Sequence, residues 1–368
     1  MGRFFDLVTD PVRLLGPHAR AVPATRHQTD TELLELNANE SPYGPSPRAV
    51  AAMREALEGS HFYPDDGAVA LRRKLAQVHG LPAEHFLISN GTTALLASMA
   101  RALLRPGLKA VTSACSFIVY PMAVRATGAT LVETPLRDGG YDLAAVRAAI
   151  DEDTRLVFLA NPNNPTGTLL EAARVDQFLK DVPPHVIVLL DEAYYDYAQH
   201  FATLRGVEYS HALDYVRSDK NIVVLRTLSK AHGLAGIRTG YGIGPAELMT
   251  YVARMQDTFA VSSVAQAAAL AALDDEGHVR CAVENNTRQA EWLVAEIAKL
   301  GFSAIPTWAN FLFFDVKQDA REFARRLRQE GVLIRPLNTW GAPTALRVTI
   351  GSAQQNRRFV QALQKIAG

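Results

Sequence analysis

"RTLSKAHGLAGIRTGYGIG" (residues 226–244) follows four apolar residues, IVVL, at positions 222–225. Such a run is typical of a strand buried in a sheet that is covered on both faces, because β-branched side chains fit that setting. Lys230 comes just after the strand, and Arg238 follows eight residues later. A solvated surface lysine needs no such setting. We therefore ask whether Lys230 is a nucleophile.

Short apolar strands alternate with amphipathic helices on both sides of this stretch. The segments with strand character are HFLIS, KAVTS, ATLVETPL, RLVFLAN, HVIVLLDEA, NIVVLRTLS and TGYGIG. Helical patterns such as TTALLASMARALL separate most of them. This alternation predicts an α/β fold with a mostly parallel sheet between two layers of helices.

The pattern changes after a long helical stretch at 245–300. FSAIPTWANFLFFDV, VLIRPL and ALRVTIG are strand-like and alternate with the helical segments DAREFARRLRQEG and AQQNRRFVQALQKIAG. We expect a large domain at 46–285 and a small α+β domain at 286–368. Residues 1–45, which are rich in proline and irregular, are expected to pack with the small domain.

Polar side chains follow the ends of four predicted strands. In an open α/β sheet, ligands bind beyond the carboxyl ends of the strands, so these side chains are the candidates for a site. They are Gly91 and Thr92 after HFLIS, Asn164 after RLVFLAN, Asp191 and Tyr194 after VIVLL, and Thr227, Ser229 and Lys230 after IVVL. One edge of the sheet would then carry an amide, a carboxylate with a phenol, an amine with hydroxyls, and a helix N-terminus.

This set of groups matches the needs of one cofactor, pyridoxal 5′-phosphate. The cofactor requires a lysine for its aldehyde, an acid for its ring nitrogen and donors for its ring oxygen. Lys230, Asp191 and the pair Tyr194 and Asn164 would meet these needs. Its phosphate requires an anion site, for which we expect the helix start at Gly91 and Thr92 with Thr227, Ser229 and Arg238. Phe117, after another strand end, could stack on the ring.

Each of these residues taken alone also has an ordinary structural explanation. An aspartate after a strand often caps a turn or helix, NGTT could be only a helix N-cap, and a lone lysine usually extends to solvent. The glycines of GYGIG fall within a strand and not in a strand-to-helix turn, so they do not form a dinucleotide-binding loop. The order of the polar groups, each at a strand end, favours the functional interpretation.

Composition excludes several other classes. The 38 basic and 38 acidic residues give a formal net charge of zero, which argues against a nucleic-acid partner. Two cysteines, Cys115 and Cys281, cannot build a disulfide framework or a metal site. No apolar run approaches the ~20 residues of a spanning helix, and no signal peptide is evident. We expect a cytoplasmic enzyme that acts on small molecules and has no membrane partner.

Nearly the whole chain resembles the fold-type I, class I and II aminotransferases, and most of all their histidinol-phosphate aminotransferase branch. The similarity is carried, in order, by LNANESPYGPSP, HFYPDDGAVALRRKLA, NPNNPTG, DEAYYDY, RTLSKAHGLAGIRTGY, ANFLFFDV and LRVTIGSAQQN. The lysine motif with its arginine eight residues on is the most specific of these. The resemblance implies a large domain with a seven-stranded sheet and a ping-pong transamination through a Schiff base of Lys230.

The resemblance also implies residues outside the strand ends. Tyr63 would reach the cofactor phosphate of a second subunit, which implies a homodimer. Arg347 would bind the carboxylate of an amino-acid substrate, Arg335 would be a second anion clamp, and Asn310 would lie near the site. The expected partners are histidinol phosphate as amino donor and 2-oxoglutarate, the keto acid of glutamate, as acceptor.

The chain departs from that branch at two positions. Thr92-Thr93-Ala94 stands where the branch usually has small and acidic residues, and Trp340 stands where a tyrosine is usual. These departures concern the substrate, so an aromatic amino-acid aminotransferase is the close alternative. A decarboxylase or lyase on the same scaffold would share every cofactor residue. A ligand-sensing regulator would need an added DNA-binding domain, for which residues 1–45 are too short and too neutral.

Overall fold

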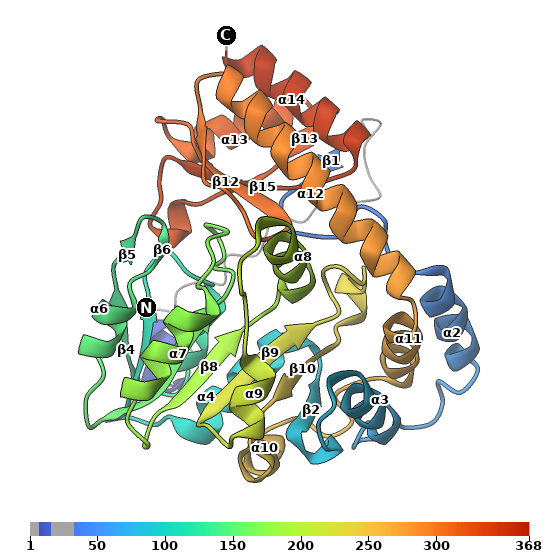
Figure 1. Cartoon of the computed structure of the whole chain (residues 1–368), viewed down its shortest axis with the longest axis vertical. Helices are drawn as coiled ribbons and strands as arrows, with labels where there is room; N and C mark the ends of the chain where they lie inside the picture. Colours follow the sequence, from blue (N-terminus) through green and yellow to red (C-terminus); the bar gives the residue numbers. More distant parts are fainter. Residues whose placement is uncertain (1–6, 16–32, 368) are drawn as a thin grey trace.

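The larger part of the molecule is built on one mixed sheet (Figure 1). The computed structural model describes residues 7–15 and 33–367. The sheet has seven strands in the order β2-β10-β9-β8-β7-β3-β4. They are β2 (Phe86–Ser89), β3 (Lys109–Ser113), β4 (Thr130–Thr134), β7 (Thr154–Ala160), β8 (Ile187–Asp191), β9 (Ile222–Thr227) and β10 (Gly240–Ile243). The pairs from β9 to β4 are parallel and β10 is antiparallel to both neighbours, so the prediction of a mostly parallel seven-stranded sheet is confirmed.

Helices cover both faces of this sheet. In Figure 1, α7 (Ala172–Asp181) and α9 (Ala212–Arg217) lie in front of the strands and α4 (Gly91–Leu103) lies behind them. The other helices of this part are α1 (Asp10–Leu14), α2 (Pro47–Leu57), α3 (Val69–His79), α5 (Val119–Arg125), α6 (Leu143–Ala148), α8 (Tyr195–Arg205), α10 (Ala246–Ala253) and α11 (Ser263–Leu273). A two-stranded hairpin, β5 (Leu136–Arg137) with β6 (Gly140–Tyr141), follows β4. All residues of β9 are buried, as expected for a strand covered on both faces.

The glycines of β10 let α4 lie close to the sheet. A Cβ atom on Gly240 would lie 2.9 Å from the backbone nitrogen of Thr92, and one on Gly242 would lie 2.7 Å from Cδ2 of Leu95. Both distances are shorter than side chains allow. The start of α4 is therefore held against β10 by close packing, and β10 lies between β9 and β2.

The smaller part has its own sheet and core. Its four strands, in the order β11-β12-β15-β14, are antiparallel: β11 (Ser303–Ala304), β12 (Phe311–Asp315), β15 (Ala345–Thr349) and β14 (Arg335–Pro336). Helices α12 (Glu276–Lys299), α13 (Ala320–Gln329) and α14 (Ala353–Ala367) pack with them around a second hydrophobic cluster. β1 (Leu34–Glu35) pairs in parallel with β13 (Val332–Leu333), so residues 34–35 join this part.

The proposed domain limits stay a prediction. The limit at 285–286 falls inside α12, which runs as one helix from the larger part into the smaller one (Figure 1). Most of the predicted N-terminal segment, at 1–6 and 16–32, lies outside the described residues. The predicted helical stretch at 245–300 consists of three helices, α10, α11 and α12.

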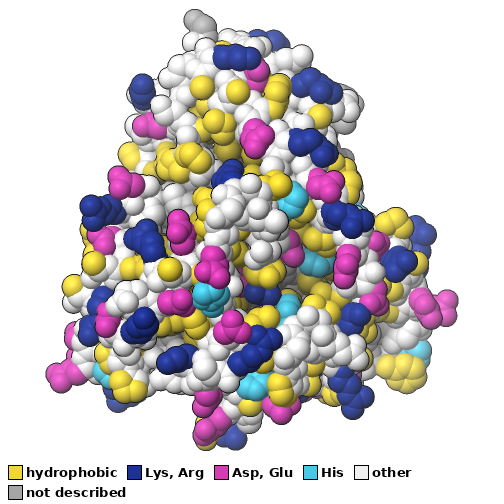
Figure 2. All heavy atoms as spheres, in the orientation of Figure 1, with side chains coloured by type: hydrophobic (Ala, Val, Ile, Leu, Met, Phe, Trp, Pro, Cys, Tyr) yellow, Lys and Arg dark blue, Asp and Glu magenta, His cyan; other side chains and the backbone are white. Residues whose placement is uncertain are grey.

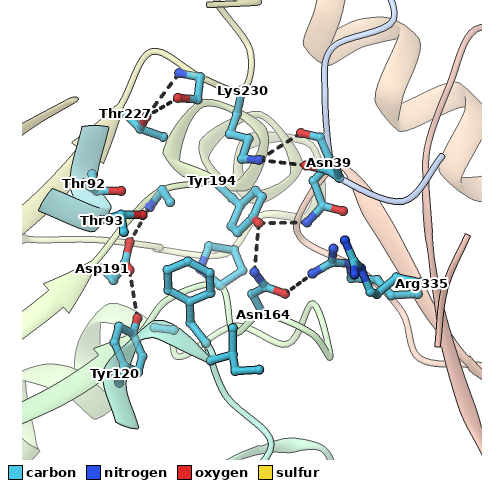
Figure 3. A pocket seen from close by; sticks show the side chains of 18 of the residues that line it. Asn39, Thr92, Thr93, Tyr120, Asn164, Asp191, Tyr194, Thr227, Lys230 and Arg335 are labelled. Carbon is cyan, nitrogen blue, oxygen red and sulfur yellow. Dashed lines mark hydrogen bonds between the residues drawn. The ribbon is translucent and has the colours of Figure 1, made fainter. Parts of the chain in front are cut away.

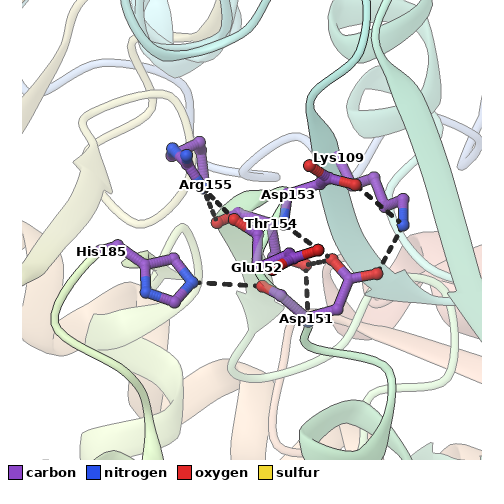
Figure 4. A network of polar contacts seen from close by, with 7 residues as sticks. All are labelled: Lys109, Asp151, Glu152, Asp153, Thr154, Arg155 and His185. Atoms are coloured by element: carbon purple, nitrogen blue, oxygen red, sulfur yellow. Dashed lines mark hydrogen bonds and ion pairs between the residues drawn. The ribbon is translucent and has the colours of Figure 1, made fainter.

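A polar network lies at the amino ends of two neighbouring strands, β3 and β7 (Figure 4). Lys109, at the start of β3, donates to Oδ2 of Asp151 at 2.5 Å and lies 3.5 Å from a carboxylate oxygen of Asp153. The hydroxyl of Thr154, at the start of β7, donates to Oδ1 of the same aspartate at 2.9 Å. Since Lys109 pairs with Thr154, this network joins the amino ends of two neighbouring strands. It is solvent-exposed and contributes little to stability.

Candidate active site

A cavity of about 340 Å³ lies at the carboxyl ends of the strands, where the two parts of the molecule meet (Figure 3). Eleven predicted residues line it: Thr92, Phe117, Asn164, Asp191, Tyr194, Thr227, Ser229, Lys230, Arg238, Arg335 and Arg347. The larger part supplies nine of them, of which Asp191 and Thr227 end strands and the others lie in helices or loops, and the smaller sheet supplies the last two. Residues far apart in the chain are thus brought together, as the strand ends predict.

Asp191 ends β8 at the bottom of this cavity and is buried. The hydroxyl of Tyr120 donates to its Oδ2 at 2.8 Å, and the backbone N–H of Ala193 donates to its Oδ1 at 3.1 Å. Burial raises the pKa of Asp191 to about 6, although both hydrogen bonds act in the other direction. A buried carboxylate in this setting favours a cationic partner.

The phenol of Tyr194 is fixed by two amides. Asn39 donates to its oxygen at 2.9 Å and Asn164 donates at 3.2 Å. Because the oxygen accepts twice, its own proton is left to donate to another group. Burial raises the pKa of Tyr194, so the phenol stays protonated near neutral pH.

Lys230 lies opposite this phenol and reaches the N-terminal segment. Its Nζ donates to the carbonyl oxygens of Ala38 at 3.2 Å and Asn39 at 3.1 Å. Burial, and then the positive charge of Arg347, lowers the pKa of Lys230 to about 7. A large fraction of the side chain is therefore a neutral amine at physiological pH. Lys230 is therefore suited to act as a nucleophile and as a base, since both roles require a neutral amine.

A cradle for an anion lies at the start of α4. Gly91 has φ +76°, and a Cβ atom there would lie 2.5 Å from Nη2 of Arg238. The guanidinium therefore sits against the first turn of a 13-residue helix, where backbone N–H groups favour negative charge. The hydroxyl of Thr227 donates to that of Ser229 at 3.0 Å beside it. Gly91 does not line the cavity; it makes room for the arginine that does.

Two arginines from the smaller sheet form the other end of the cavity. Arg335 pairs with Arg347 across β14 and β15. Arg347 donates to Oδ1 of Asn164 at 2.5 Å and to the carbonyl of Asn37 at 3.0 Å, while its Nε is buried without a partner among the described residues. Burial lowers the pKa of Arg347 to about 10 and also lowers that of Arg335. Two partly desolvated cations side by side favour an anionic ligand.

Besides Gly91, two further predicted residues lie away from the cavity lining. Tyr63 is 81% exposed and stacks on Phe259, with ring centroids 4.5 Å apart. Asn310 is buried beneath the site, where its Nδ2 donates to the carbonyl of Asn39 at 3.1 Å. Within this chain, Tyr63 contributes nothing to the cavity, and Asn310 acts on it through Asn39.

Tyr120 and Asn39 are residues of the site that the sequence did not identify. Tyr120 lies three residues after Phe117, one helical turn away, and this spacing is the signal that could have linked it to the strand end. Asn39 belongs to LNANESPYGPSP, an irregular segment that carries part of the family resemblance but in which the sequence predicts no site residue. Its φ of 56° is left-handed, a conformation that asparagine tolerates better than most residues. That backbone turns its carbonyl toward Lys230 while its amide reaches Tyr194.

The site fits pyridoxal phosphate by its chemistry. The cradle at Gly91 and Arg238 suits a phosphate, the lowered pKa of Lys230 suits an aldehyde, and the buried carboxylate of Asp191 suits a pyridinium nitrogen. The hydroxyl proton of Tyr194 remains available to donate to the ring oxygen of the cofactor.

Comparison with known proteins agrees with this geometry. The family Aminotransferase class I and II matches residues 31–363. The chain is 43% identical to a histidinol-phosphate aminotransferase of Moorella thermoacetica, over 91% of this chain and 86% of that protein. It is 41% identical to histidinol-phosphate aminotransferase 2 of Pseudomonas fluorescens, over 99% of this chain and 98% of that protein.

Solved structures point to the same family. The histidinol-phosphate aminotransferase of Sinorhizobium meliloti, in complex with pyridoxal 5′-phosphate, is 27% identical and superimposes with a TM-score of 0.86, covering 98% of this chain and 97% of that one. No helix within residues 7–15 and 33–367 is long and apolar enough to cross a membrane. The fold, the site and these relatives lead to one assignment: the chain belongs to the class I and II aminotransferases and is a pyridoxal-phosphate-dependent transaminase.

Proposed function

We propose that this enzyme transfers the amino group of histidinol phosphate to 2-oxoglutarate. The observation that carries the proposal is the pairing of Arg335 with Arg347 at one end of a cavity whose other end holds Lys230 and Asp191. Glutamate and 2-oxoglutarate each have two carboxylates, and histidinol phosphate has a phosphate, so both partners offer anions to the same guanidiniums. The names of the relatives from Moorella and Pseudomonas support this substrate.

The residues of the cavity divide into those that hold the cofactor and those that hold the substrate. Bound pyridoxal phosphate supplies an aldehyde and an aromatic ring that stabilises negative charge beside the reacting carbon. Asp191 would hold the ring nitrogen protonated, while Tyr194 and Asn164 would bind the ring oxygen. Thr92, Thr227, Ser229 and Arg238 would bind the phosphate, assisted by the space at Gly91. Phe117 would lie on the ring face.

Lys230 would serve first as the anchor of the aldehyde and then as the base that moves the Cα proton. Its amine is suited to both roles because its pKa lies near 7. The carbonyls of Ala38 and Asn39 accept its two N–H groups, which leaves the lone pair for the proton. Replacing Lys230 by alanine is expected to leave the cofactor bound without a covalent link and to stop turnover.

We further propose a homodimer in which Tyr63 reaches the cofactor phosphate of the other subunit. The supporting observation is the exposure of Phe62, Tyr63 and Phe259 at 70%, 81% and 42%, since aromatic side chains grouped on a surface favour contact with a partner. A Tyr63→Phe variant mixed with a Lys230→Ala variant should regain part of the activity. No regain in hybrid dimers would place the whole site within one subunit. The cytoplasmic location also stays a prediction.

A comparison of two substrates tests the proposed amino donor. Arg335→Ala should lower kcat/KM for histidinol phosphate by about a hundredfold, since a charged hydrogen bond at a bidentate site contributes ~2–3 kcal/mol. The same variant should change kcat/KM for phenylalanine far less. Wild-type enzyme should also prefer histidinol phosphate.

An aromatic amino-acid aminotransferase is the second candidate. Trp340 and Phe117 line the cavity and could enclose an aromatic side chain. If phenylalanine is the better substrate of the wild type and Arg335→Ala loses both activities equally, this second function replaces the first.

A further inference from the structure

A second cavity, of about 390 Å³, lies on the other face of the same strands. Arg226 of β9 and Tyr241 of β10 are cross-strand partners and both line it. Because successive strand residues point to opposite faces, the Cβ position of the neighbouring Gly240 faces α4 instead, 2.9 Å from the backbone nitrogen of Thr92. The space-filling view shows this side of the molecule hollowed between α8 and the lower half of α12, with histidine side chains around the hollow (Figure 2).

The floor of this cavity is polar but carries no net charge. Arg226 donates through Nε and Nη2 to Oε2 of Glu192, at 3.0 and 2.8 Å, and its guanidinium lies 3.4 Å from the ring centroid of Tyr195. His79 shares a 3.0 Å hydrogen bond with the hydroxyl of Tyr241, and burial lowers its pKa to about 3, so the imidazole is neutral. The buried ions are therefore already compensated by each other.

The charged residues of the cavity wall formed by α8 and α12 differ from the Arg226–Glu192 pair of the floor, because they are not paired with each other. Asp196 of α8 and Glu276 and Arg280 of α12 line the cavity, and within residues 7–15 and 33–367 none of them forms an ion pair with another lysine, arginine, aspartate or glutamate. Nδ1 of the neighbouring His232 lies 3.9 Å from Oδ2 of Asp196. That Nδ1 is buried and has no hydrogen-bond partner. An N–H donor of a ligand placed between Nδ1 of His232 and Oδ2 of Asp196 would form hydrogen bonds with both atoms.

The remaining wall is apolar. Leu228, Leu273, Val279 and Val283 also line the cavity. The cavity therefore offers two carboxylates, one guanidinium and an apolar interior. A small molecule with an ammonium, a carboxylate and an apolar side chain is complementary to all three.

We propose that this cavity is a second, non-catalytic site that binds a zwitterionic amino acid with an apolar side chain. The ammonium would lie at Asp196 and Glu276, the carboxylate at Arg280 and the side chain among the leucines and valines. This site is independent of the amino donor that the enzyme uses.

The backbone links this second site to the active site. Glu192 and Arg226 line the second cavity, Asp191 next to Glu192 lines the active-site cavity, and Thr227 next to Arg226 lines both. His232 lies two residues after Lys230. A ligand that moves the floor or His232 therefore shifts the segments that carry the reactive groups, and its occupancy is expected to change kcat.

Calorimetric titration of the cofactor-loaded enzyme with L-leucine tests the binding. The Arg347→Ala background removes the carboxylate clamp of the active site, so binding that remains reports on the second cavity. We expect a dissociation constant on the order of 0.1–1 mM for a ligand of this size, weakened about tenfold or more by Asp196→Asn or Arg280→Gln. Arg254→Gln, on the surface near α10, is the matched control and should bind as the parent does.

Two analogues test the ligand class. Leucinol lacks the carboxylate and 4-methylpentanoate lacks the ammonium, and both should bind at least about tenfold more weakly than leucine. Loss of all leucine binding in Arg347→Ala, or binding unaffected by Asp196→Asn and Arg280→Gln, overturns the proposed site. Leucine that changes kcat in wild type but not in Arg280→Gln supports the link to the active site; an unchanged kcat at saturation refutes that link.

Discussion

The hydroxyl of Tyr120 donates a 2.8 Å hydrogen bond to Oδ2 of Asp191, and both side chains are buried. The tyrosine comes from α5 and the aspartate from the end of β8, 71 residues apart in the chain. The bond is charge-assisted and opposes the effect of burial, which alone would raise the pKa of the carboxyl further. Tyr120 therefore orients Asp191 and keeps its carboxylate ionised.

Replacing Tyr120 by phenylalanine should remove this bond while keeping the ring stacked on Phe158, 4.7 Å away. A hydrogen bond to a charged group contributes ~1.5–3 kcal/mol, so kcat should fall about ten- to a hundredfold. Since the pKa of Asp191 would rise, the acid limb of the pH–rate profile should move to higher pH. Tyr215→Phe, which removes a bond to Asp176 instead, serves as control. An unshifted profile in Tyr120→Phe would show that the bond is only structural.

Asp191→Asn should change how the stability of the apo protein depends on pH. The pKa of Asp191 is raised to about 6 from its ordinary 3.8, so the folded state holds this proton more tightly than the unfolded state does. The proton bound to Asp191 therefore stabilises the folded state below pH 4, and this stabilisation is lost as pH rises to 6. Asparagine cannot ionise, so the variant should gain about 2 kcal/mol over wild type between pH 4 and 7. Urea unfolding at both pH values measures this difference, and a constant difference would contradict it.

Asp191→Asn should also cost orders of magnitude in kcat, because a neutral amide cannot hold the ring nitrogen of the cofactor protonated. Each factor of ten corresponds to about 1.4 kcal/mol of barrier. Stopped-flow measurement of a single half-reaction isolates this effect from substrate binding. A loss under about threefold would exclude the role that we assign to the carboxylate.

Gly91→Ala should displace the Arg238 guanidinium, because the new Cβ would lie 2.5 Å from its Nη2 at a φ of +76°. We expect the cofactor to bind about tenfold or more weakly, and the unfolding free energy to fall by ~1–2 kcal/mol. Gly236→Ala is a matched control, since nothing lies within 4 Å of its Cβ position. Fluorescence titration with pyridoxal phosphate measures the affinity. Equal affinities of the two variants would show that Arg238 does not bind the cofactor phosphate.

Two substitutions at Asn39 distinguish the contribution of its backbone conformation from that of its side-chain amide. Asn39→Gly keeps the left-handed φ of 56° easy to adopt but removes the amide that donates to Tyr194. Asn39→Ala removes the same amide and adds a backbone penalty of ~1 kcal/mol. Both variants should therefore lose the same factor in kcat, while alanine should lower the melting temperature more than glycine does. Different kcat values for the two variants would mean that the carbonyl facing Lys230, and not the amide, is what matters.

The chemistry at the strand ends could be predicted from the sequence. Asp191, Lys230 and Asn164 each follow an apolar run, and parallel strands place their carboxyl ends at one edge by geometry alone. Residue type then limits what such an edge can bind. These are local patterns, so they need no knowledge of how distant segments pack.

Contacts between distant segments were decided only by the tertiary structure. Asn39 reaches Tyr194 across 155 residues and Thr349 across 310. The sequence places Glu192 beside Asp191, but the ion pair with Arg226 and the cavity in front of it depend on how α8, α11 and α12 cover the sheet. Periodicity tells which face of a strand a side chain occupies. It does not tell which helix covers that face or whether the packing leaves a space, because those depend on the summed shapes of side chains from many segments.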